Sequence, residues 1–594
     1  MNGPVLVFGG PYSNLQATEA VLAEAGRRGI PPERIVCTGD VVAYGAAARE
    51  TVALVRRAGI RVVRGNCEEA LGQSGRDCGC GFAPGSACHR LSAAWYAHAD
   101  RELGAEDRAW MRSLAPRLDI EIAGFRLAVL HGGVSDVSRF VFASVPARVK
   151  ALELQAAGTD GIVAGHCGLP FSQVVGGRLW HNAGAVGMPA NDGTPRVWFS
   201  LLTPGNGLRI EHVALAYDHA AAARAMRAAG LPEGYAAALE TGLWPSCDVL
   251  PPAELKATGV PLAPGSLTWR RNDLREASWP APAAPIRLDP RKFRDPAVTA
   301  KGEARARVAL DKLDTLWINT GTLCNLACAN CYIESSPRND RLAYISAAEV
   351  AAYLDEIERD ELGTELIGFT GGEPFMNREL PAMLEDALAR GFRALVLTNA
   401  MKPMRRHGER LRALKARFGD RLAIRVSLDH YAKPLHELER GPRSWQPTLD
   451  GLTWLSSEGF SPTVAGRLYS GEAESLVRAG YARLFAAHGI PLDASDPADL
   501  VLFPEMDAGA DVPEISEACW DILGVSPASV MCASSRMVVK RKGEAPSVIA
   551  CTLLPYDAEF ELGRTLRDAC RPVPLNHPHC AKFCVLGGAS CSRG

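Results

Sequence analysis

The chain has 594 residues, of which 47% are hydrophobic and 22% charged, and its formal net charge is −2. This length is more than one hydrophobic core supports, so we expect several domains of ordinary globular composition. The charge balance argues against a nucleic-acid partner, and no apolar run reaches the roughly 20 residues that a helix needs to cross a bilayer. The first residues lack the basic lead of a signal peptide, so we expect a cytoplasmic protein whose 17 cysteines serve metals or redox chemistry.

A short apolar strand followed by a polar loop recurs through the first third of the chain. It occurs at residues 5–15, 36–45, 62–69, 130–133 and 163–168. The order of these motifs, down to 182–187, resembles that of the calcineurin-like metallophosphoesterases over roughly residues 1–215. The resemblance implies an α/β sandwich of two sheets between helices, with two metals at the strand ends and one aspartate bridging them.

The resemblance, carried over residue by residue, implies only half of that metal site. The ligands expected for one metal are present and are Asp40, Asn66, His131 and His166. The other metal lacks three ligands, because Gly10, Tyr12 and Gly168 stand where the family has an aspartate and two histidines. Two-metal hydrolysis needs one ion to activate water and another to hold the phosphoryl oxygens. We therefore expect the usual chemistry to fail here.

Three interpretations of this half-site stay open. In the first, the domain is a pseudo-phosphoesterase that binds a substrate, a phosphorylated group or a partner, with one divalent metal (iron, manganese or zinc) or none. In the second, thiolates rebuild the vacant half and favour a soft metal; the candidates are Cys67, Cys78, Cys80, Cys88 and Cys167. Three of these, Cys78, Cys80 and Cys88, also fit ordinary thiols on a loop. In the third, a one-metal phosphatase or phosphodiesterase activity survives.

The segment 246–305 is rich in proline, which fixes φ and removes a backbone donor, and it predicts an extended connector. Trp269 and Trp279 within it can dock on a domain. The predicted divisions are a phosphoesterase-like domain at 1–245, this connector, a core domain at 306–508 and a cysteine-rich extension at 509–594.

Cys324, Cys328 and Cys331 are separated by three and then two residues, and Tyr332 follows directly. Cuboidal 4Fe–4S clusters usually take four thiolates, so a three-thiolate loop leaves one iron free for a substrate or cofactor. The motif resembles the signature of the radical S-adenosylmethionine (SAM) superfamily, in which SAM chelates that iron and an electron cleaves it to a 5′-deoxyadenosyl radical. The alternative is a structural zinc knuckle, which normally has a second ligand pair close by.

An apolar run at 366–370 ends in Gly371-Gly372-Glu373-Pro374 and predicts a buried strand whose end allows close approach of a ligand. Further apolar strands, each next to a helical stretch, are expected at 394–397, 423–429, 463–465 and 500–503. This alternation predicts a parallel barrel with its site at the carboxyl-terminal rim. The family's core is a partial (β/α)6 barrel. The resemblance implies SAM contacts from Tyr332, Gly371, Gly372, Glu373, Pro374, Asn399, Ser427 and Asp429.

Seven cysteines follow residue 500 and indicate a second metal centre. Cys532 and Cys551 flank a predicted hairpin, 537–540 with 548–550, and three thiols follow in a glycine-containing tail. The segment resembles the auxiliary-cluster extensions called SPASM or twitch, which implies a second 4Fe–4S cluster. The expected ligands are Cys551, Cys580, Cys584 and Cys591, with Cys532 as the first substitute. A structural zinc and unliganded buried thiols stay open as alternatives.

The sequence thus predicts an α/β multidomain radical SAM enzyme that abstracts hydrogen from a substrate at the barrel mouth. A flavodoxin-type or ferredoxin-type protein is the expected electron donor. The phosphoesterase-like domain favours a small phosphorylated or nucleotide-like substrate, whereas the auxiliary extension favours a peptide. Arg425 and Arg467 are candidates for a carboxylate clamp. A metal-dependent phosphohydrolase with an accessory iron–sulfur domain, and an iron–sulfur sensor or binding protein, are the alternatives.

Overall fold

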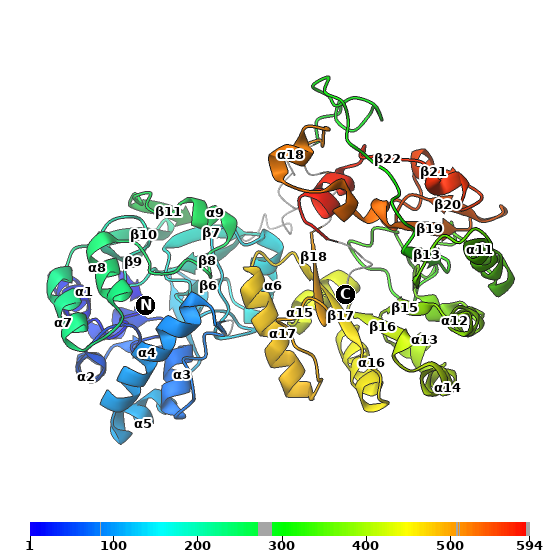
Figure 1. Ribbon diagram of the computed structural model, residues 1–594. Coiled ribbons are helices and arrows are strands. Elements are labelled where there is room, and N and C mark those ends of the chain that lie inside the picture. The colour runs from blue at the N-terminus through cyan, green and yellow to red at the C-terminus, as the bar shows by residue number, and fades with distance from the viewer. Residues whose placement is uncertain (83–84, 271–287, 506–508, 510, 590–594) are drawn as a thin grey trace. The chain divides into compact units, whose positions relative to one another are not determined.

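The computed structural model describes residues 1–82, 85–270, 288–505, 509 and 511–589 (Figure 1). The chain forms two compact units, Met1–Ala283 with Ser470–Ala479 and Ala284–Tyr469 with Gly480–Gly594. Within the described residues, no helix combines the length and the apolar character needed to cross a membrane.

The first unit contains two β-sheets. One sheet has the strand order β11-β10-β9-β1-β2-β3, and the other has the order β4-β5-β6-β8-β7. The first sheet consists of β1 (Val5–Phe8), β2 (Ile35–Cys37), β3 (Arg61–Val62), β9 (Val197–Gly205), β10 (Gly207–Leu215) and β11 (Gly265–Trp269). The second consists of β4 (Arg117–Ile122), β5 (Phe125–Leu130), β6 (Gly161–Ala164), β7 (Phe171–Val175) and β8 (Arg178–Asn182). Apolar side chains from both sheets, such as Val5, Leu127 and Val163, form one buried cluster. The predicted two-sheet sandwich is confirmed.

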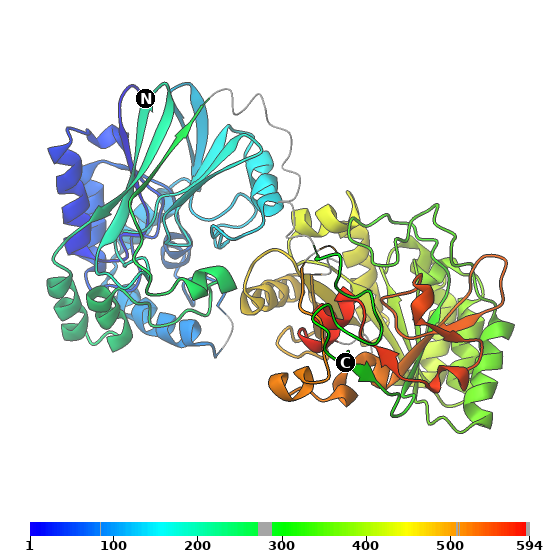
Figure 2. The same cartoon turned by 90° about the horizontal axis from the view of Figure 1, so that it is seen from above.

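Helices cover the outer faces of these sheets. They are α1 (Leu15–Arg27), α2 (Ala48–Ala58), α3 (Asn66–Gly72), α4 (Ala87–Glu102), α5 (Ala105–Ser113), α6 (Ala147–Ala157), α7 (His219–Ala228), α8 (Glu233–Thr241) and α9 (Pro252–Lys256). Within this unit, Figures 1 and 2 show α1, α7 and α8 on one side of the sheets and α6 on the other. Asn14 begins α1 as its N-cap, because its side-chain oxygen accepts a hydrogen bond from the backbone N–H of Ala17 (3.1 Å).

Part of the proline-rich segment belongs to the first sheet. Its strand β11 pairs antiparallel with β10, and Trp269 at the end of β11 is fully buried. The indole stacks on Phe125 at a centroid distance of 4.1 Å, and its Nε1–H donates to the carbonyl of Gly177 (2.9 Å). The docking expected of Trp269 is confirmed, whereas Trp279 lies outside the described residues. The segment 246–305 therefore contains regular structure, α9 and β11, that the expectation of an extended connector did not include.

The second unit is built on a nine-stranded sheet in the order β18-β17-β16-β15-β14-β13-β19-β20-β21. Its strands are β13 (Thr315–Asn319), β14 (Leu366–Thr370), β15 (Arg393–Thr398), β16 (Leu422–Ser427), β17 (Thr463–Leu468), β18 (Leu500–Pro504), β19 (Ser535–Val539), β20 (Ser547–Ile549) and β21 (Glu561–Gly563). The strands from β13 to β18 are parallel neighbours in chain order, which confirms the predicted parallel core. A separate two-stranded sheet pairs β12 (Arg307–Val308) with β22 (Val573–Pro574).

The helices that alternate with these strands are α11 (Ala347–Arg359), α12 (Leu380–Ala389), α13 (Lys402–Arg405), α14 (Gly408–Phe418), α15 (Lys433–Arg440), α16 (Trp445–Ser457) and α17 (Glu474–His488); α18 (Cys519–Leu523) follows β18. The predicted hairpin is present, because β19 and β20 are antiparallel. In addition, β19 pairs parallel with β13. The cysteine-rich segment thus continues the sheet of the barrel.

Candidate functional site

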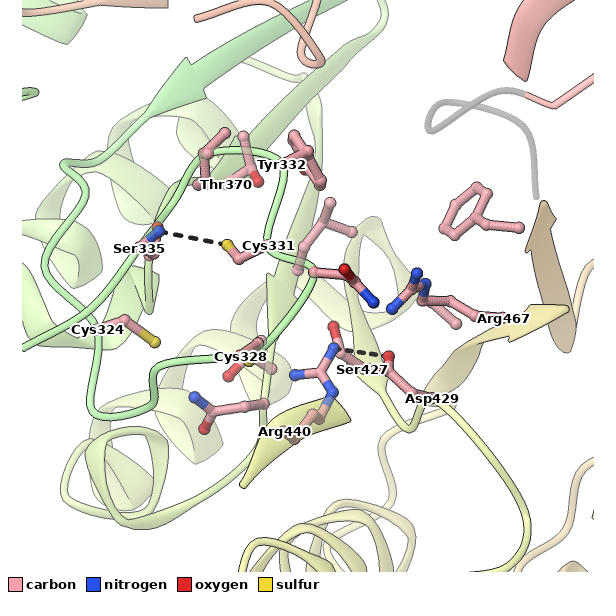
Figure 3. Close-up of a pocket in the computed structure, with 18 of the residues that line it drawn as sticks. Cys324, Cys328, Cys331, Tyr332, Ser335, Thr370, Ser427, Asp429, Arg440 and Arg467 are labelled. Carbon is pink, nitrogen blue, oxygen red and sulfur yellow. Dashed lines mark hydrogen bonds and ion pairs between the residues drawn. The ribbon is translucent and has the colours of Figure 1, made fainter. Parts of the chain in front are cut away.

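A cavity of about 180 Å³ lies at the carboxyl-terminal ends of the parallel strands (Figure 3). The cysteine loop supplies Cys324, Cys328 and Cys331 to its wall, and the strand ends supply Thr370, Ser427 and Arg467 among others. Figure 3 shows the loop on one side of the cavity and Arg440, Asp429 and Arg467 on the other. The site therefore lies at the predicted rim of the barrel.

Most of the SAM-contact residues predicted from the sequence line this one cavity. Those that do are Tyr332, Gly371, Gly372, Asn399, Ser427 and Asp429. Glu373 and Pro374 do not line it and are both buried in the loop after β14. The predicted set therefore divides into side chains at the cavity wall and side chains that support the wall.

Of the three thiols of the loop, Cys324 is buried and the other two are partly buried, and backbone N–H groups donate to Cys324 and Cys331. The N–H of Leu326 donates to Sγ of Cys324 (3.4 Å), and the N–H of Ser335 donates to Sγ of Cys331 (3.3 Å; dashed in Figure 3). Burial raises the pKa of Cys324 to about 12. Burial also raises the pKa of Cys328, although the Arg440 guanidinium acts in the opposite direction. A metal that binds these thiols would have to displace their protons.

The two glycines after β14 are required by a close approach between two backbone segments. The N–H of Gly372 donates to the carbonyl of Gly321 (2.8 Å), on the chain that enters the cysteine loop. A Cβ atom on Gly372 would lie 2.3 Å from the carbonyl oxygen of Leu323, and Gly371 has φ = +140°. No other residue fits this contact without moving the cysteine loop.

Glu373 holds the ends of β14 and β15 together. Its carboxylate accepts hydrogen bonds from the N–H of Asn399 (2.9 Å), the hydroxyl of Thr398 (2.8 Å) and the N–H of Phe375 (3.2 Å). Asn399 in turn donates through its side chain to Oδ1 of Asn325 in the cysteine loop (2.9 Å). Burial raises the pKa of Glu373 to about 7.

Arginines form the opposite wall of the cavity. Arg440 at the end of α15 donates to Asp429 (3.0 Å), and Arg467 donates to Glu439 (2.8 Å). Burial raises the pKa of Asp429, but the two guanidinium groups outweigh it and hold that pKa below its usual value. Arg425 is also buried and lines the cavity, and its Nε–H donates to Thr463 (3.1 Å). Arg440 was not among the residues predicted from the sequence, because an arginine at the end of a helix carries no local signal.

Four thiols of the carboxyl-terminal segment line a second, small cavity in the same unit. They are Cys532, Cys551, Cys580 and Cys584, and apolar side chains complete the wall. Residues Cys580–Val585 form a π-helix, a rare element that occurs often at functional sites. Burial raises the pKa of Cys532 to about 11 against the effect of the Arg536 guanidinium. The substitute ligand Cys532 lies with the other three thiols, and the predicted ligand Cys591 lies outside the described residues.

The first unit places three of the predicted metal ligands together. Asp40, His131 and His166 are buried, and they offer ligand atoms that all lie within 4.8 Å of one another. Nε2 of His131 is 3.2 Å from Oδ2 of Asp40 and 2.8 Å from Nδ1 of His166. Because Nδ1 of His131 donates to the carbonyl of Thr38 (2.7 Å), the tautomer that binds a metal through Nε2 is favoured.

Asn66, the fourth predicted ligand, is buried with its side-chain oxygen free of a hydrogen bond among the described residues. Its side-chain amide donates to the carbonyl of Cys78 (2.8 Å) and to Sγ of Cys80 (3.2 Å). Cys67 lies 3.6 Å from the same amide. Three of the five candidate cysteines, Cys67, Cys78 and Cys80, therefore lie around Asn66. The other two lie elsewhere: the thiol of Cys88 donates a hydrogen bond to Ser246, and that of Cys167 donates one to the carbonyl of Leu169.

The side chain of Tyr12 lies at the positions where the resemblance implied that a second metal has lost its ligands. A Cβ atom on Gly10 would lie 2.2 Å from Cζ of Tyr12, so the ring occupies the space of the missing aspartate. The phenol oxygen is 3.8 Å from the place of a Cβ atom on Gly168, where the second histidine is missing. The three positions at which the sequence lacks the family's metal ligands therefore lie together, around the ring of Tyr12.

Comparison with known proteins finds a family match in each of two separate parts of the chain. Residues 12–203 match the calcineurin-like phosphoesterase superfamily domain, and residues 318–474 match the radical SAM superfamily. The chain is 27% identical over 153 residues to Fe-coproporphyrin III synthase of Methanosarcina barkeri, covering 25% of this chain and 36% of that protein. It is 29% identical over 143 residues to the antilisterial bacteriocin subtilosin biosynthesis protein AlbA of Bacillus subtilis, covering 24% and 30%.

The chain thus spans about a third of the length of these relatives. Among solved structures, a metallophosphoesterase from Sphaerobacter thermophilus is 27% identical, with a TM-score of 0.33 and coverage of 41% of this chain and 100% of that one. Together with the sites described above, the two family matches show that the protein joins an N-terminal calcineurin-like phosphoesterase domain to a radical SAM domain.

Proposed function

We propose that the protein is a radical SAM enzyme whose SAM-binding 4Fe–4S cluster is held by Cys324, Cys328 and Cys331. The observation that carries the proposal is that these three thiols, and no fourth, line the cavity at the strand ends of the described barrel. That donor set fits a cluster with one open iron. When bound and reduced, the cluster supplies the electron that cleaves SAM to a 5′-deoxyadenosyl radical.

The chain's own residues bind and orient the reactants around that cluster. Gly371 and Gly372 let the loop after β14 lie against the cysteine loop, and Glu373 fixes this loop to the end of β15. Arg440 is a donor to the carboxylate of SAM, because it lies beside Cys328 and Asp429 at the cavity wall with only 15% of its side chain exposed. Tyr332, Asn399 and Ser427 complete the SAM site from three different segments.

The substrate proposed for this site carries a carboxylate or phosphate group. Arg425 and Arg467 line the cavity together with Arg440, and guanidinium groups bind both anions with two hydrogen bonds. A peptide and a small phosphorylated or nucleotide-like metabolite both meet this condition. The relatives include one named for bacteriocin biosynthesis and one named for a coproporphyrin, so their names favour neither class. An electron donor of the flavodoxin or ferredoxin type would reduce the cluster. A reducing compartment such as the cytoplasm suits a protein whose 17 cysteines serve iron–sulfur chemistry.

An auxiliary 4Fe–4S cluster on Cys532, Cys551, Cys580 and Cys584 is the second part of the proposal. Four thiols that line one small, otherwise apolar cavity match the ligand number of a fully liganded cluster. This set exchanges Cys591 for Cys532 relative to the expectation from the sequence. A structural zinc, which also takes four thiolates, is the alternative that metal analysis would detect.

The phosphoesterase domain is proposed to bind a phosphorylated group or a partner and not to catalyse phosphoester hydrolysis. Asp40, Asn66, His131 and His166 suit one divalent metal such as iron, manganese or zinc. The ring of Tyr12 takes the space of a second metal. The pair of ions that two-metal hydrolysis needs, one to activate water and one to hold the phosphoryl oxygens, would then be incomplete. One metal, or none, would then position a phosphorylated group or a partner.

The test is anaerobic reconstitution of the full chain with iron and sulfide, followed by dithionite and SAM. Wild type should hold about eight irons, as two 4Fe–4S clusters require, and should release 5′-deoxyadenosine. Cys328→Ala should release none. A fully loaded wild type that releases no 5′-deoxyadenosine would overturn the radical mechanism and favour an iron–sulfur sensor. Phosphohydrolysis that is lost with Asp40→Asn and kept with Cys328→Ala would favour a phosphohydrolase with an accessory cluster.

A further inference from the structure

Arg536 is a buried positive charge next to the proposed auxiliary cluster site. Its side chain is only 1% exposed, and it belongs to β19, four residues after Cys532. A guanidinium group does not lose its proton in proteins. Burying a charge is costly unless an opposite charge compensates it.

Backbone carbonyls are the hydrogen-bond partners of this guanidinium. Its Nε–H donates to Ala569 (2.9 Å), Nη1 donates to Cys532 (2.5 Å) and Ser535 (2.8 Å), and Nη2 donates to Arg571 (3.4 Å). These acceptors are neutral, so they orient the group without balancing its charge. Among the described residues, no carboxylate forms an ion pair with Arg536.

Another buried arginine of the same unit shows the usual arrangement. Arg305 is 2% exposed and lies 2.6 Å from the carboxylate of Glu514, which compensates its charge. The ionisable groups that act on Arg536 are instead thiols, those of Cys532, Cys570 and Cys551. Two of them, Cys532 and Cys551, line the small cavity with Cys580 and Cys584. The negative charge that balances Arg536 can therefore come from the thiolates of that cavity, or from a metal cluster that they bind.

We propose that Arg536 is the charge partner of the auxiliary cluster and a positioning residue that sets its reduction potential. The inference rests on the proposed cluster at Cys532, Cys551, Cys580 and Cys584. Four thiolates give a 4Fe–4S cluster a net negative charge in both states of its one-electron couple. A fixed cation stabilises the reduced state more, because that state carries one more negative charge, and so it raises the potential. The electron comes from the external donor, and no bond is made or broken in the step.

The test uses the full chain with Cys324, Cys328 and Cys331 all changed to Ala, so that only the auxiliary cluster assembles. Redox titration followed by electron paramagnetic resonance gives its potential. Arg536→Gln should make the potential more negative, and Arg536→Lys, which keeps the charge, should stay close to the parent. Lys542→Gln, which removes an exposed cation just after the same strand, is the matched control and should cause no shift.

Each outcome bears on the inference. Equal shifts in Arg536→Lys and Arg536→Gln, or no shift in either, would overturn it, because a merely structural arginine gives that result. If Arg536→Gln assembles no cluster while Arg536→Lys does, a required charge is supported. If neither assembles one, the geometry of the four hydrogen bonds matters and the charge role is wrong. A parent that holds zinc or no metal would refute the auxiliary cluster itself, a failure that iron and zinc analysis distinguishes from the others.

Discussion

The ring of Tyr12 lies where a side chain at position 10 would begin, with only 2.2 Å between its Cζ atom and the place of a Cβ atom on Gly10. An aspartate at position 10 cannot return alone, because it would collide with the ring. Under the proposed loss of the second metal, the aspartate at position 10 can therefore return only if Tyr12 changes as well.

Restoring three residues together should return two-metal phosphodiesterase activity. The variant combines Gly10→Asp, Tyr12→His and Gly168→His, so that the second metal regains its ligands and its space. Hydrolysis of bis-(p-nitrophenyl) phosphate with added manganese measures the outcome. Gly10→Asp alone should stay inactive and lose stability. Activity of the wild type equal to that of the triple variant would contradict the proposed binding role.

Gly372→Ala should disturb the SAM site through the backbone. The added methyl group would lie 2.3 Å from the carbonyl of Leu323, and overpacking of this kind costs about 1–3 kcal/mol. Release of 5′-deoxyadenosine should fall together with the melting temperature of the second unit. Gly26→Ala, on α1 with nothing within 4 Å of the new methyl group, is the control and should cost nothing. A fully active Gly372→Ala enzyme would argue against the close approach.

Arg440→Gln should weaken SAM binding. Hydrogen bonds to charged groups contribute about 1.5–3 kcal/mol, so the dissociation constant of SAM should rise about 10-fold to 100-fold. Equilibrium binding to the anaerobically reconstituted enzyme measures it. Arg412→Gln, which removes an exposed arginine paired with Glu458, should leave the constant unchanged. If Arg440→Gln binds SAM as tightly as wild type, the arginine holds only Asp429.

The stability of the second unit should depend on pH through Glu373. Its pKa of about 7 lies above the roughly 4.3 of an exposed glutamate. Between these values the folded unit keeps a proton that the unfolded chain has released. This contribution is complete below the lower pKa and is lost as pH rises through the higher one.

Glu373→Gln, which stays neutral at every pH, should remove that slope. Thermal unfolding of wild type and variant from pH 5 to pH 8 measures the difference. The exposed residue Glu385, changed to Gln, provides the comparison and should keep the slope of wild type. A wild type and a Glu373→Gln variant with parallel pH profiles would show that the carboxyl group does not titrate in this window.

Cys532→Ala should remove the auxiliary cluster and leave the SAM cluster in place. Iron should fall by about four per chain, while uncoupled release of 5′-deoxyadenosine continues. Cys570→Ala is a matched control, because its thiol is exposed and does not line the small cavity. Iron content that falls only with Cys591→Ala would restore the ligand set expected from the sequence.

The sequence predicted the parts of the fold that repeat a local pattern. Buried strands such as β14 and β16 are apolar runs with polar ends, and the cysteine spacing marks its loop, so both were visible without a structure. The site depends also on contacts between distant segments. Arg440 reaches Asp429 across 11 residues, and Glu373 reaches Asn399 across 26. Nothing in the local sequence distinguishes Arg440 from a surface arginine, and the motifs that mark Glu373, Asn399 and Asp429 do not state these contacts.

The thiols of the carboxyl-terminal segment depend in the same way on contacts between distant parts of the chain. Four cysteines with spacings of 19, 29 and 4 residues meet at one cavity because the hairpin of β19 and β20 and the π-helix bring them there. Spacing alone favoured Cys591 over Cys532, since Cys591 is closer in sequence to Cys580 and Cys584. The hairpin places Cys532 at the cavity, and the sequence does not state that placement.

The pairing of β13 with β19 has a consequence for synthesis on the ribosome. The first strand of the barrel has β14 on one side and a strand more than 200 residues later on the other. As the chain emerges, the free edge of β13 stays open until Val539 has left the exit tunnel, and an open strand edge invites pairing with other chains. The barrel is thus among the last parts of this protein to become complete, and a nascent chain halted before β19 is the form most in need of a chaperone.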